Sequence, residues 1–492
     1  MTCYINGVIH TMLHEKEMYH QLVVENGIIV NVGDALDLSS CDQIIDLKGA
    51  HLYPGFVDAH LHLLGYGEHL ATPNLSACTN KQMVFQHLDQ FRGSAYLFAQ
   101  GYLDQGITAE ELEIRYPGQI MLLRHNDFHG LTLSKAALNH FHVSDDTGIL
   151  KELKAQHVLD LIPKKTKQSL MMMLEKAMDS LYQYGITGGH SDDLFYYNGF
   201  DETYAVFEDV MKKKPFRTHL LMHHEVIDDY IKSKKLWGIQ SPYLELGAVK
   251  MFYDGTMSSQ TALMKDPYKT TKDHGEVVMG KDHFTEVLLK ARSYGLPVAV
   301  HVIGDLGLDE VVDLLHTYPP KEGLMDRIIH APWMMHETLA KMKGRPMTFD
   351  IQPPFLASDL PRAYQLFSKA PDAHFPWKTY LNHQLILSGS SDAPVENPNP
   401  LLGIRDAIFR RSRVDHQVYQ KEEALSAFEA IKLYTTTAHA QSLITPRGYI
   451  KKGYLADFTV LDQAIEHMEE EAFSKPHVVM TIIDNKIVYR RD

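Results

Sequence analysis

The sequence lacks the features that mark secreted, membrane-spanning or nucleic-acid-binding proteins. Its 492 residues include three cysteines, Cys3, Cys41 and Cys78, with no C-x-x-C pair, which speaks against a disulfide framework and a thiolate zinc site. No apolar run reaches the roughly 18 residues of a membrane span, and the N-terminus has no basic segment followed by an apolar one. The net charge of −14 disfavours nucleic acid and anionic membranes as partners, because both require a basic face. We therefore expect a cytoplasmic protein that binds neither.

What the sequence does contain is typical of a large globular protein with an unusual supply of histidine. Hydrophobic residues make up 45% of the chain and charged residues 22%. The chain is longer than a single core supports, so we expect one large domain and at least one smaller one. The 29 histidines direct the search for a functional site toward metal ligands.

Both ends of the chain show short strands of alternating polarity separated by turns. Near the N-terminus, QLVVENGIIVNVG carries an Asn26-Gly27 hairpin signal, and the C-terminal segments GYLADFTVLD and HVVMTIIDNKIVYR have the same alternation. Neither set of strands is large enough to be stable alone. We predict that residues 1–53 and 445–492 pack together as one composite β-sandwich domain.

Between the two ends, strands alternate with helices, which is the pattern of parallel β/α units. The strands that we expect are 55–60, 185–190, 217–223, 244–252, 296–302, 327–330, 346–352 and 384–390. Eight such units predict an α/β fold with a closed, TIM-like (β/α)8 barrel over residues 54–444. The segment at about 65–163 is too long for one connection and has its own strand, QIMLLRHN, so we predict an inserted α+β subdomain after the first barrel strand.

The first barrel strand ends in two histidines that point the same way. In YPGFVDAHLHL successive side chains alternate between faces, so His60 and His62 share one face while Val57, Ala59 and Leu61 pack on the other. Two adjacent imidazoles make a poor core. They make a good start for a metal site.

Further residues of ligand type stand near the carboxyl ends of later strands. Lys250, His301 and His330 lie near the ends of the fourth, fifth and sixth strands, and Asp392 follows the eighth. In a barrel these strand ends surround one mouth, so we expect the side chains to converge with the two histidines of the first strand. A lone histidine at a strand end is more often a hydrogen-bonded structural residue than a ligand, but the joint set of nitrogen and oxygen donors suits zinc or a similar divalent ion.

Lys250 poses a problem of charge, because an ammonium beside metal cations is repelled and desolvated without compensation. One solution is carbamylation by carbon dioxide, which turns the lysine into a carboxylate that can bridge two metal ions. The other is an ion pair with a nearby acid such as Asp254, and the spacing does not decide between them. Tyr253 and Gln352 also stand at strand ends and are candidates for contact with the substrate.

These motifs, in this order, resemble those of the metal-dependent amidohydrolase superfamily, specifically its amidohydrolase-3 branch, which includes YtcJ-like proteins and N-substituted formamide deformylases. The resemblance covers nearly the whole chain. It rests on PGFVDAHLH (54–62), KMFYDGTMSSQTALM (250–264), HVIGD (301–305), RIIHA (327–331), SGSSDAPVENPNPLLGI (388–404) and GYLADFTVLD (453–462).

The resemblance implies a set of site residues. The implied metal ligands are His60, His62, Lys250, His301, His330 and Asp392. In the family's pattern the first two histidines and the aspartate hold the more buried ion, the other two histidines hold the second, and the N6-carboxylated lysine bridges both. The motif RHNDFHGLTLSKAAL (124–138) further implies that Asp127 and His129 approach the substrate.

The chemistry that follows is hydrolysis of a carbon–nitrogen bond other than a peptide bond, in a small molecule of the amide type. One or two divalent ions, with zinc the expected metal, bring the pKa of a bound water to about 7, and the metal-bound hydroxide attacks the carbonyl. Asp392 takes the proton and delivers it to the leaving nitrogen. Two alternatives remain open, a mononuclear deaminase on the same barrel and a non-catalytic barrel that acts as an interaction module. The substrate is not specified, and a homodimer is the default assembly.

Overall fold

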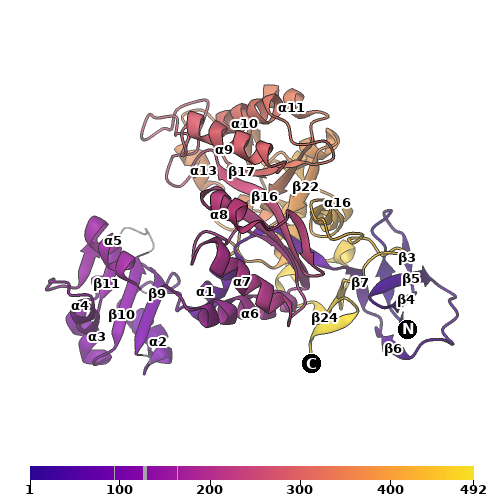
Figure 1. Cartoon of the computed structure of the whole chain (residues 1–492), viewed down its shortest axis with the longest axis horizontal. Helices are drawn as coiled ribbons and strands as arrows, with labels where there is room; N and C mark the ends of the chain where they lie inside the picture. Colours follow the sequence, from indigo (N-terminus) through magenta and orange to yellow (C-terminus); the bar gives the residue numbers. More distant parts are fainter. Residues whose placement is uncertain (94, 126–129, 163) are drawn as a thin grey trace. The chain divides into compact units, whose positions relative to one another are not determined.

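The computed structural model describes residues 1–93, 95–125, 130–162 and 164–492. The chain forms two compact units, Met1–Leu63 with Ala177–Asp492, and Leu64–Lys176 (Figure 1). Within the described ranges, none of the helices combines the length and the apolar character needed to cross a membrane.

The centre of the first unit is a barrel of parallel strands. Its strands are hydrogen-bonded in the order β22-β20-β18-β17-β16-β14-β13-β8, and β22 and β8 meet at the seam of the nearly closed barrel. Their bounds are β8 Phe56–Leu61, β13 Ile186–Ser191, β14 Arg217–His223, β16 Leu244–Phe252, β17 Val298–Val302, β18 Asp326–His330, β20 Met347–Ile351 and β22 Ile386–Gly389. Each coincides with a predicted strand, so the predicted α/β barrel is confirmed. A short strand, β15 (Gly238–Ser241), pairs antiparallel with β16.

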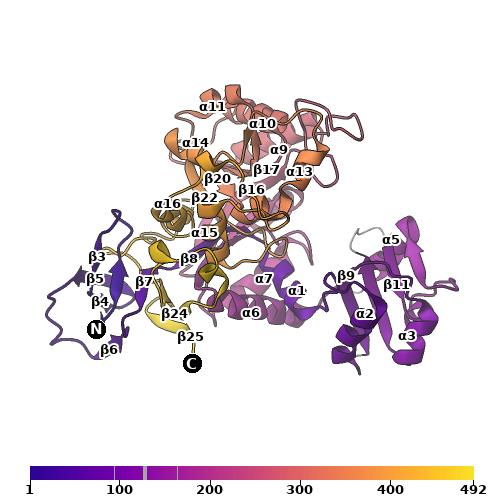
Figure 2. The same cartoon turned by 180° about the vertical axis from the view of Figure 1, so that it is seen from behind.

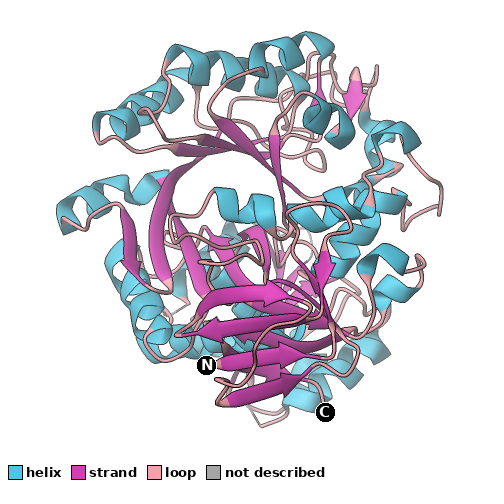
Figure 3. Ribbon diagram, turned by 90° about the vertical axis from the view of Figure 1, so that its right-hand side faces the viewer, coloured by secondary structure: helices cyan, strands magenta, loops and turns pink. Residues whose placement is uncertain are grey.

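Helices cover the outer side of the barrel strands (Figure 3). In α6 (Lys167–Gln183), Leu170, Leu174 and Leu181 are buried, whereas Met172 is 60% exposed, as a helix with one apolar stripe requires. The others are α7 Phe200–Met211, α8 Ile227–Ser233, α9 Lys281–Ser293, α10 Asp305–Thr317, α11 His336–Met342, α12 Pro353–Asp359, α13 Arg362–Leu366, α14 Trp377–Asn382, α15 Pro400–Phe409, α16 Ala427–Leu433 and α17 Thr436–Ala440. Two short strands in the segments between barrel strands, β19 (Trp333–Met334) after β18 and β21 (Ala373–His374) after β20, form a small antiparallel pair.

Strands from both ends of the chain share one sheet. Its order is β25-β24-β23-β7-β2-β3, in which the N-terminal β7 (His51–Pro54) pairs antiparallel with the C-terminal β23 (Phe458–Leu461) (Figure 2). The other members are β2 Val8–His10, β3 Met18–Tyr19, β24 Val478–Ile483 and β25 Lys486–Arg490. A second sheet, β5-β4-β1-β6, contains only N-terminal strands: β1 Thr2–Ile5, β4 Gln21–Glu25, β5 Ile28–Gly33 and β6 Gln43–Asp46.

The Asn26-Gly27 hairpin is confirmed. Strands β4 and β5 pair antiparallel across it, and both turn residues have positive φ, 50° for Asn26 and 75° for Gly27. This is the backbone conformation that a tight hairpin turn requires and that asparagine and glycine tolerate best.

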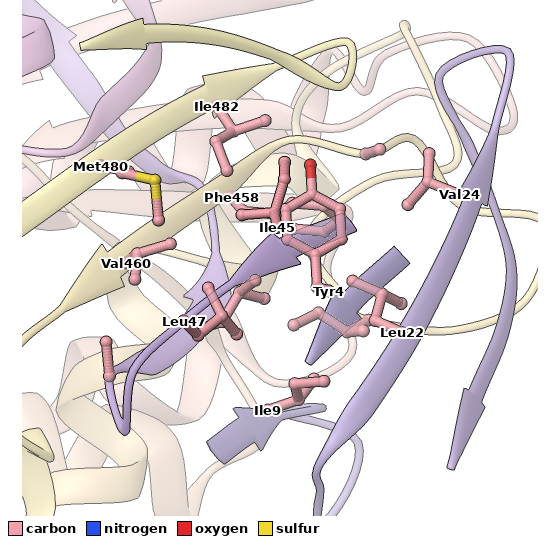
Figure 4. Close-up of a cluster of buried hydrophobic side chains, with 14 of the residues drawn as sticks. Tyr4, Ile9, Leu22, Val24, Ile45, Leu47, Phe458, Val460, Met480 and Ile482 are labelled. Atoms are coloured by element: carbon pink, nitrogen blue, oxygen red, sulfur yellow. The ribbon is translucent and has the colours of Figure 1, made fainter. Parts of the chain in front are cut away.

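One apolar core joins the two terminal sheets (Figure 4). Tyr4, Leu22 and Ile45 come from the N-terminal strands, while Phe458 and Ile482 come from the C-terminal ones, and the ring of Tyr4 meets that of Phe458 edge to face at 5.6 Å. Full burial of a large apolar side chain contributes about 1.5–3 kcal/mol, so shared burial holds the two ends of the chain together.

The three cysteines speak against a disulfide framework, but the structure pairs two of them in a single disulfide. Cys3 and Cys41 form a disulfide, with their Cα atoms 5.9 Å apart. Cys41 precedes β6, which pairs parallel with β1 so that Cys3 faces Ile44. This long-range pairing places the two cysteines side by side, and their spacing in the sequence does not reveal it.

The second unit has its own mixed sheet, in the order β12-β11-β10-β9. The strands are β9 Tyr96–Tyr102, β10 Ile120–His125, β11 Gly130–Leu133 and β12 Ile149–Lys151, and β10 is the predicted strand QIMLLRHN. Its helices are α2 Lys81–Leu88, α3 Ala109–Arg115, α4 Lys135–His140 and α5 Glu152–Leu161, while α1 (Leu63–Ala71) leads in from the barrel. A capping box between Thr108 and Glu111 fixes the start of α3. The domain limits expected from the sequence remain a prediction.

Candidate metal centre

Three ligand-type side chains meet where β8 and β22 end. The Nε2 atoms of His60 and His62 lie 3.3 and 3.4 Å from Oδ1 of Asp392, and one ligand atom from each residue lies within 4.8 Å of the others. Main-chain bonds hold the two segments together, because Asp392 N donates to His60 O and His62 N donates to Ala393 O, both at 2.8 Å. Asp392 has a φ of 56°, a left-handed conformation that non-glycine residues adopt at a cost and that occurs often at functional sites.

His301 and His330 stand on neighbouring strands next to this group. Their ring centroids are 4.6 Å apart, and the ring of His330 is 5.9 Å from that of His60. Nδ1 of His330 lies 2.7 Å from Oε1 of Gln352, and Nε2 of His301 lies 3.2 Å from the carbonyl of Gly255. Both oxygens can only accept, so each imidazole donates there and keeps its other nitrogen unprotonated. That nitrogen is available to a metal ion.

The electrostatics keep three of the four imidazoles neutral. At His62 burial acts to lower the pKa, but the hydrogen bond with Asp392 and the charge of that carboxylate outweigh it and raise the pKa to about 8. Burial, followed by the Lys250 ammonium, lowers the pKa of His60 to about 3 and that of His301 to about 4. Burial and the neighbouring His301 lower the pKa of His330 well below its usual value. Burial acts to raise the pKa of Asp392, but hydrogen bonds with His60 and His62 outweigh it and hold that pKa well below its ordinary range. Neutral imidazole and ionised carboxylate are the forms that bind metals.

The residues fit a divalent metal ion. Imidazole nitrogens of the buried His60 and the half-buried His62 and a carboxylate oxygen of Asp392 lie within 4.8 Å of one another, and these are ligand atoms that zinc accepts. Among the described residues, the buried Nδ1 of His60 has no hydrogen-bond partner. One nitrogen of this group is therefore not used in the hydrogen bonds of the chain. Sequence reasoning predicted all five of these residues, and the structure brings their side chains together.

Lys250 reaches the same region, and its ion-pair partner is Asp192 rather than the suggested Asp254. Its Nζ lies 3.1 Å from Oδ2 of Asp192 and 4.0 Å from the ring centroid of Phe252, and both Lys250 and Asp192 are buried. Asp254 is not the partner, since its carboxylate accepts the backbone N–H groups of Leu263, Ile303 and Gly304 at 2.7–2.9 Å. The suggested pair between Lys250 and Asp254 is therefore wrong.

The loop after β13 supplies residues that sequence reasoning missed. Oδ1 of Asp193 lies 4.0 Å from Nδ1 of His62, and the ring of Tyr196 meets His62 edge to face with centroids 5.7 Å apart. Ser191 donates to Asp193 at 2.6 Å and receives the backbone N–H of Leu63 at 3.0 Å. The signal was present, because Asp192 and Asp193 follow a predicted barrel strand on the rim where the ligands gather.

One predicted substrate contact, Tyr253, faces away from the barrel mouth. Tyr253 is buried, its hydroxyl donates to Glu310 of α10, and its ring packs on Phe284 of α9. Lys250 and Phe252 occupy the inner face of β16, so the alternation of side chains turns Tyr253 outward, and the prediction that it faces the mouth is wrong.

Gln352 lies beside the ligand-type residues, but its side chain is already hydrogen-bonded within the protein. Besides its bond to His330, its Nε2 donates to Asp350 O and Ser390 Oγ, both at 2.9 Å. The structure thus gives no support to its predicted substrate contact. Asp127 and His129 lie outside the described residues.

A cavity of about 280 Å³ opens beside the ligand group. Its lining includes His301, His330 and Asp392 together with apolar side chains and two further carboxylates. A larger hollow of about 590 Å³ near β6 and β25 is lined without histidine. Ligand pockets commonly combine apolar walls with a few polar groups, as the smaller cavity does.

Comparison with known proteins adds a family context. The model of the amidohydrolase family matches residues 43–489. The putative amidohydrolase YtcJ of Bacillus subtilis is 33% identical over 524 residues, covering 99% of this chain and 98% of that protein. The N-substituted formamide deformylase of Arthrobacter pascens is 22% identical over 538 residues, with 99% and 98% covered. Among solved structures, a metal-dependent hydrolase of Pyrococcus horikoshii superposes with a TM-score of 0.83 at 25% identity, covering 96% of this chain and 99% of that one.

Proposed function

This chain belongs to the amidohydrolase family, and we propose that it hydrolyses a carbon–nitrogen bond of the amide type in a small molecule, using divalent metal ions held at the barrel mouth. The observation that carries the proposal is the meeting of His60, His62 and Asp392 with the neutral imidazoles of His301 and His330 beside a cavity. A metal ion bound there would lower the pKa of a water molecule toward 7 and polarise the substrate carbonyl.

The residues of the chain have distinct parts in this proposal. Asp392 is ionised and lines the cavity, so it can accept the proton of the attacking water and return it to the leaving nitrogen. The returned proton matters because an amide nitrogen leaves readily only as a neutral amine. The hydrogen bonds of His330 and His301 to Gln352 and Gly255 keep the ligand nitrogens free of protons.

The state of Lys250 separates two versions of the proposal. If its amine takes up carbon dioxide and releases a proton, the resulting carbamate can bridge two metal ions, as the family resemblance implies. If it remains an ammonium paired with Asp192, the centre holds one ion. That ion pair is the observation that favours the alternative, a mononuclear deaminase. Elemental analysis discriminates, since about two metal ions per chain supports the first version and about one the second.

The proposal predicts the effect of Asp392→Asn. The asparagine cannot take up the proton, so turnover should fall by at least about a hundredfold, the lower end of what general acid–base catalysis contributes. Steady-state hydrolysis of a panel of N-formyl and N-acetyl alkylamines measures this, with zinc content and far-UV circular dichroism recorded in parallel. A variant with intact metal content and near-native rate excludes the role assigned to Asp392. Failure of the metal-loaded wild type on every amide, with release of ammonia from amidine-type substrates, supports the deaminase.

A further inference from the structure

We propose that the substrate carries a positive charge at a distance from the scissile bond and that Asp359 is the residue that binds this charge. The inference rests on the proposed hydrolytic function, because it concerns the same cavity. It adds a substrate class, an amide with a cationic head group, and a specificity-determining residue.

The cavity beside the ligand group has a second set of charged side chains. Asp359, the last residue of α12, and Glu396, in the loop after β22, both line it together with His301, His330 and Asp392. Asp359 comes from α12, whereas His301 and His330 come from β17 and β18, and among the described residues the carboxylate of Asp359 forms no ion pair with these histidines. A substrate that fills the cavity meets the ligand group with one portion and Asp359 with another.

The charge of Asp359 is not neutralised by a close partner. Glu396 is paired with Arg413 at 3.0 Å, and Arg413 also lies 3.7 Å from Asp406. Within the described parts of the chain, no basic side chain comes within 4 Å of Asp359, although Arg362 and Arg413 act on it from farther away. Burial, and next the repulsion of Glu396, raises the pKa of Asp359 to about 6. A half-buried carboxylate without a counter-ion is costly, and a ligand cation would remove that cost.

The other residues that line the cavity are suited to the part of the substrate that joins the amide to the charged group. Met257, Ile303, Pro332, Phe355 and Val395 present apolar surface to the cavity. This lining suits a hydrocarbon chain that joins the amide to a cationic head group. The net charge of −14 favours the approach of cations to the molecule as a whole, while Asp359 provides the specific contact. The class that fits is therefore an N-acylated aminoalkyl amine.

The test uses three formamides of matched chain length with the metal-loaded, full-length protein. They are N-(5-aminopentyl)formamide, N-hexylformamide and 6-formamidohexanoate, whose far ends are cationic, neutral and anionic. We expect kcat/KM to be about tenfold higher for the cationic than for the neutral compound, the factor that one charge-assisted hydrogen bond supplies. In Asp359→Asn the preference should disappear, and far-UV circular dichroism and zinc content that match the wild type show that the variant is folded. Glu322→Gln, which removes one exposed charge elsewhere, should keep the preference.

Calorimetric binding of pentane-1,5-diamine, which is cationic at neutral pH, and of the uncharged pentane-1,5-diol tests the charge contact without turnover. Tighter binding of the diamine that is lost in Asp359→Asn supports the inference even if no formamide is hydrolysed, in which case the proposed function fails alone. Hydrolysis without a charge preference, or a preference that survives in Asp359→Asn, overturns the inference and leaves the proposed function standing. Absence of both hydrolysis and charge-dependent binding overturns both.

Discussion

Single residues set the chemical state of the candidate metal ligands through the second nitrogen of each ring. Gln352 Oε1 accepts a hydrogen bond from Nδ1 of His330, the carbonyl of Gly255 accepts one from Nε2 of His301, and Asp193 lies beside Nδ1 of His62. Such partners fix the tautomer and orientation of a histidine before a metal ion arrives, and their loss weakens metal binding without removing a ligand. Gln352 is therefore a positioning residue in our proposal.

At this scale we predict that Gln352→Met lowers zinc affinity by about 10- to 100-fold. Methionine has a similar length, but its thioether is only a weak hydrogen-bond acceptor, so it no longer holds the proton of His330 on Nδ1 and away from the nitrogen that should bind the metal. Competition with a chelator of known affinity measures the effect.

Gln441→Met is the matched control for that measurement. Its amide donates to Thr348 and Asp350, away from the ligand-type histidines, so this variant should lose stability but bind zinc as tightly as the wild type. Equal affinities for the Gln352 and Gln441 variants would contradict the positioning role.

Strand β16 shows how one element serves both the site and the fold. Near its end Lys250 and Phe252 lie on the inner face, and Tyr253, the residue that follows the strand, points outward. Near its start, Glu245 bonds Nδ1 of His219 at 2.8 Å and accepts the backbone N–H groups of residues 443 and 444, also at 2.8 Å. This carboxylate fastens the segment that leads to the C-terminal strands onto the base of the barrel.

The hydrogen bonds of Glu245 to His219 and to residues 443 and 444 predict that the protein loses stability in acid. Burial raises the pKa of Glu245, but the bonds from His219 and the main chain outweigh it and hold the pKa at about 2, below its ordinary 4.5. A depressed folded-state pKa stabilises the fold above the unfolded value, and the contribution is lost as the pH falls from about 4.5 toward 2. At ~1.4 kcal/mol per pKa unit, the contribution at neutral pH is about 3 kcal/mol.

Urea unfolding of Glu245→Gln measures this contribution. The variant should be less stable than the wild type at pH 6, and its free energy of unfolding should change less than the wild-type value between pH 6 and pH 3. Glu322→Gln, on the surface, should follow the wild type. If the free energy of unfolding of Glu245→Gln changed between pH 6 and pH 3 as much as that of the wild type, the stabilising role of the Glu245 carboxylate would be contradicted.

At the scale of the whole molecule, the barrel couples the metal centre to folding. The ligand-type residues are separated by up to hundreds of positions and share a location only because β8, β17, β18 and β22 belong to one barrel. The unfolded chain offers no such group, so a metal ion that binds the folded state stabilises it.

We therefore predict that zinc raises the melting temperature of the metal-free protein. At a free zinc concentration one hundred times the Kd, the stabilisation is about 2.7 kcal/mol. Differential scanning calorimetry with and without zinc measures the shift. It should be abolished in His60→Ala and retained in His283→Ala, whose side chain is 58% exposed on α9. An equal shift in both variants would place the zinc elsewhere.

The sequence by itself determined the eight barrel strands, the Asn26-Gly27 hairpin and the family, because strand alternation, turn residues and ordered motifs are local properties of the chain. The tertiary structure alone decided which side chains became partners. It paired Lys250 with Asp192 and not Asp254, turned Tyr253 outward, joined Cys3 to Cys41 and placed Asp359 in the cavity wall. These outcomes depend on which strands become neighbours and on the paths of the connecting loops, and the spacing of residues along the chain does not encode either in a readable form.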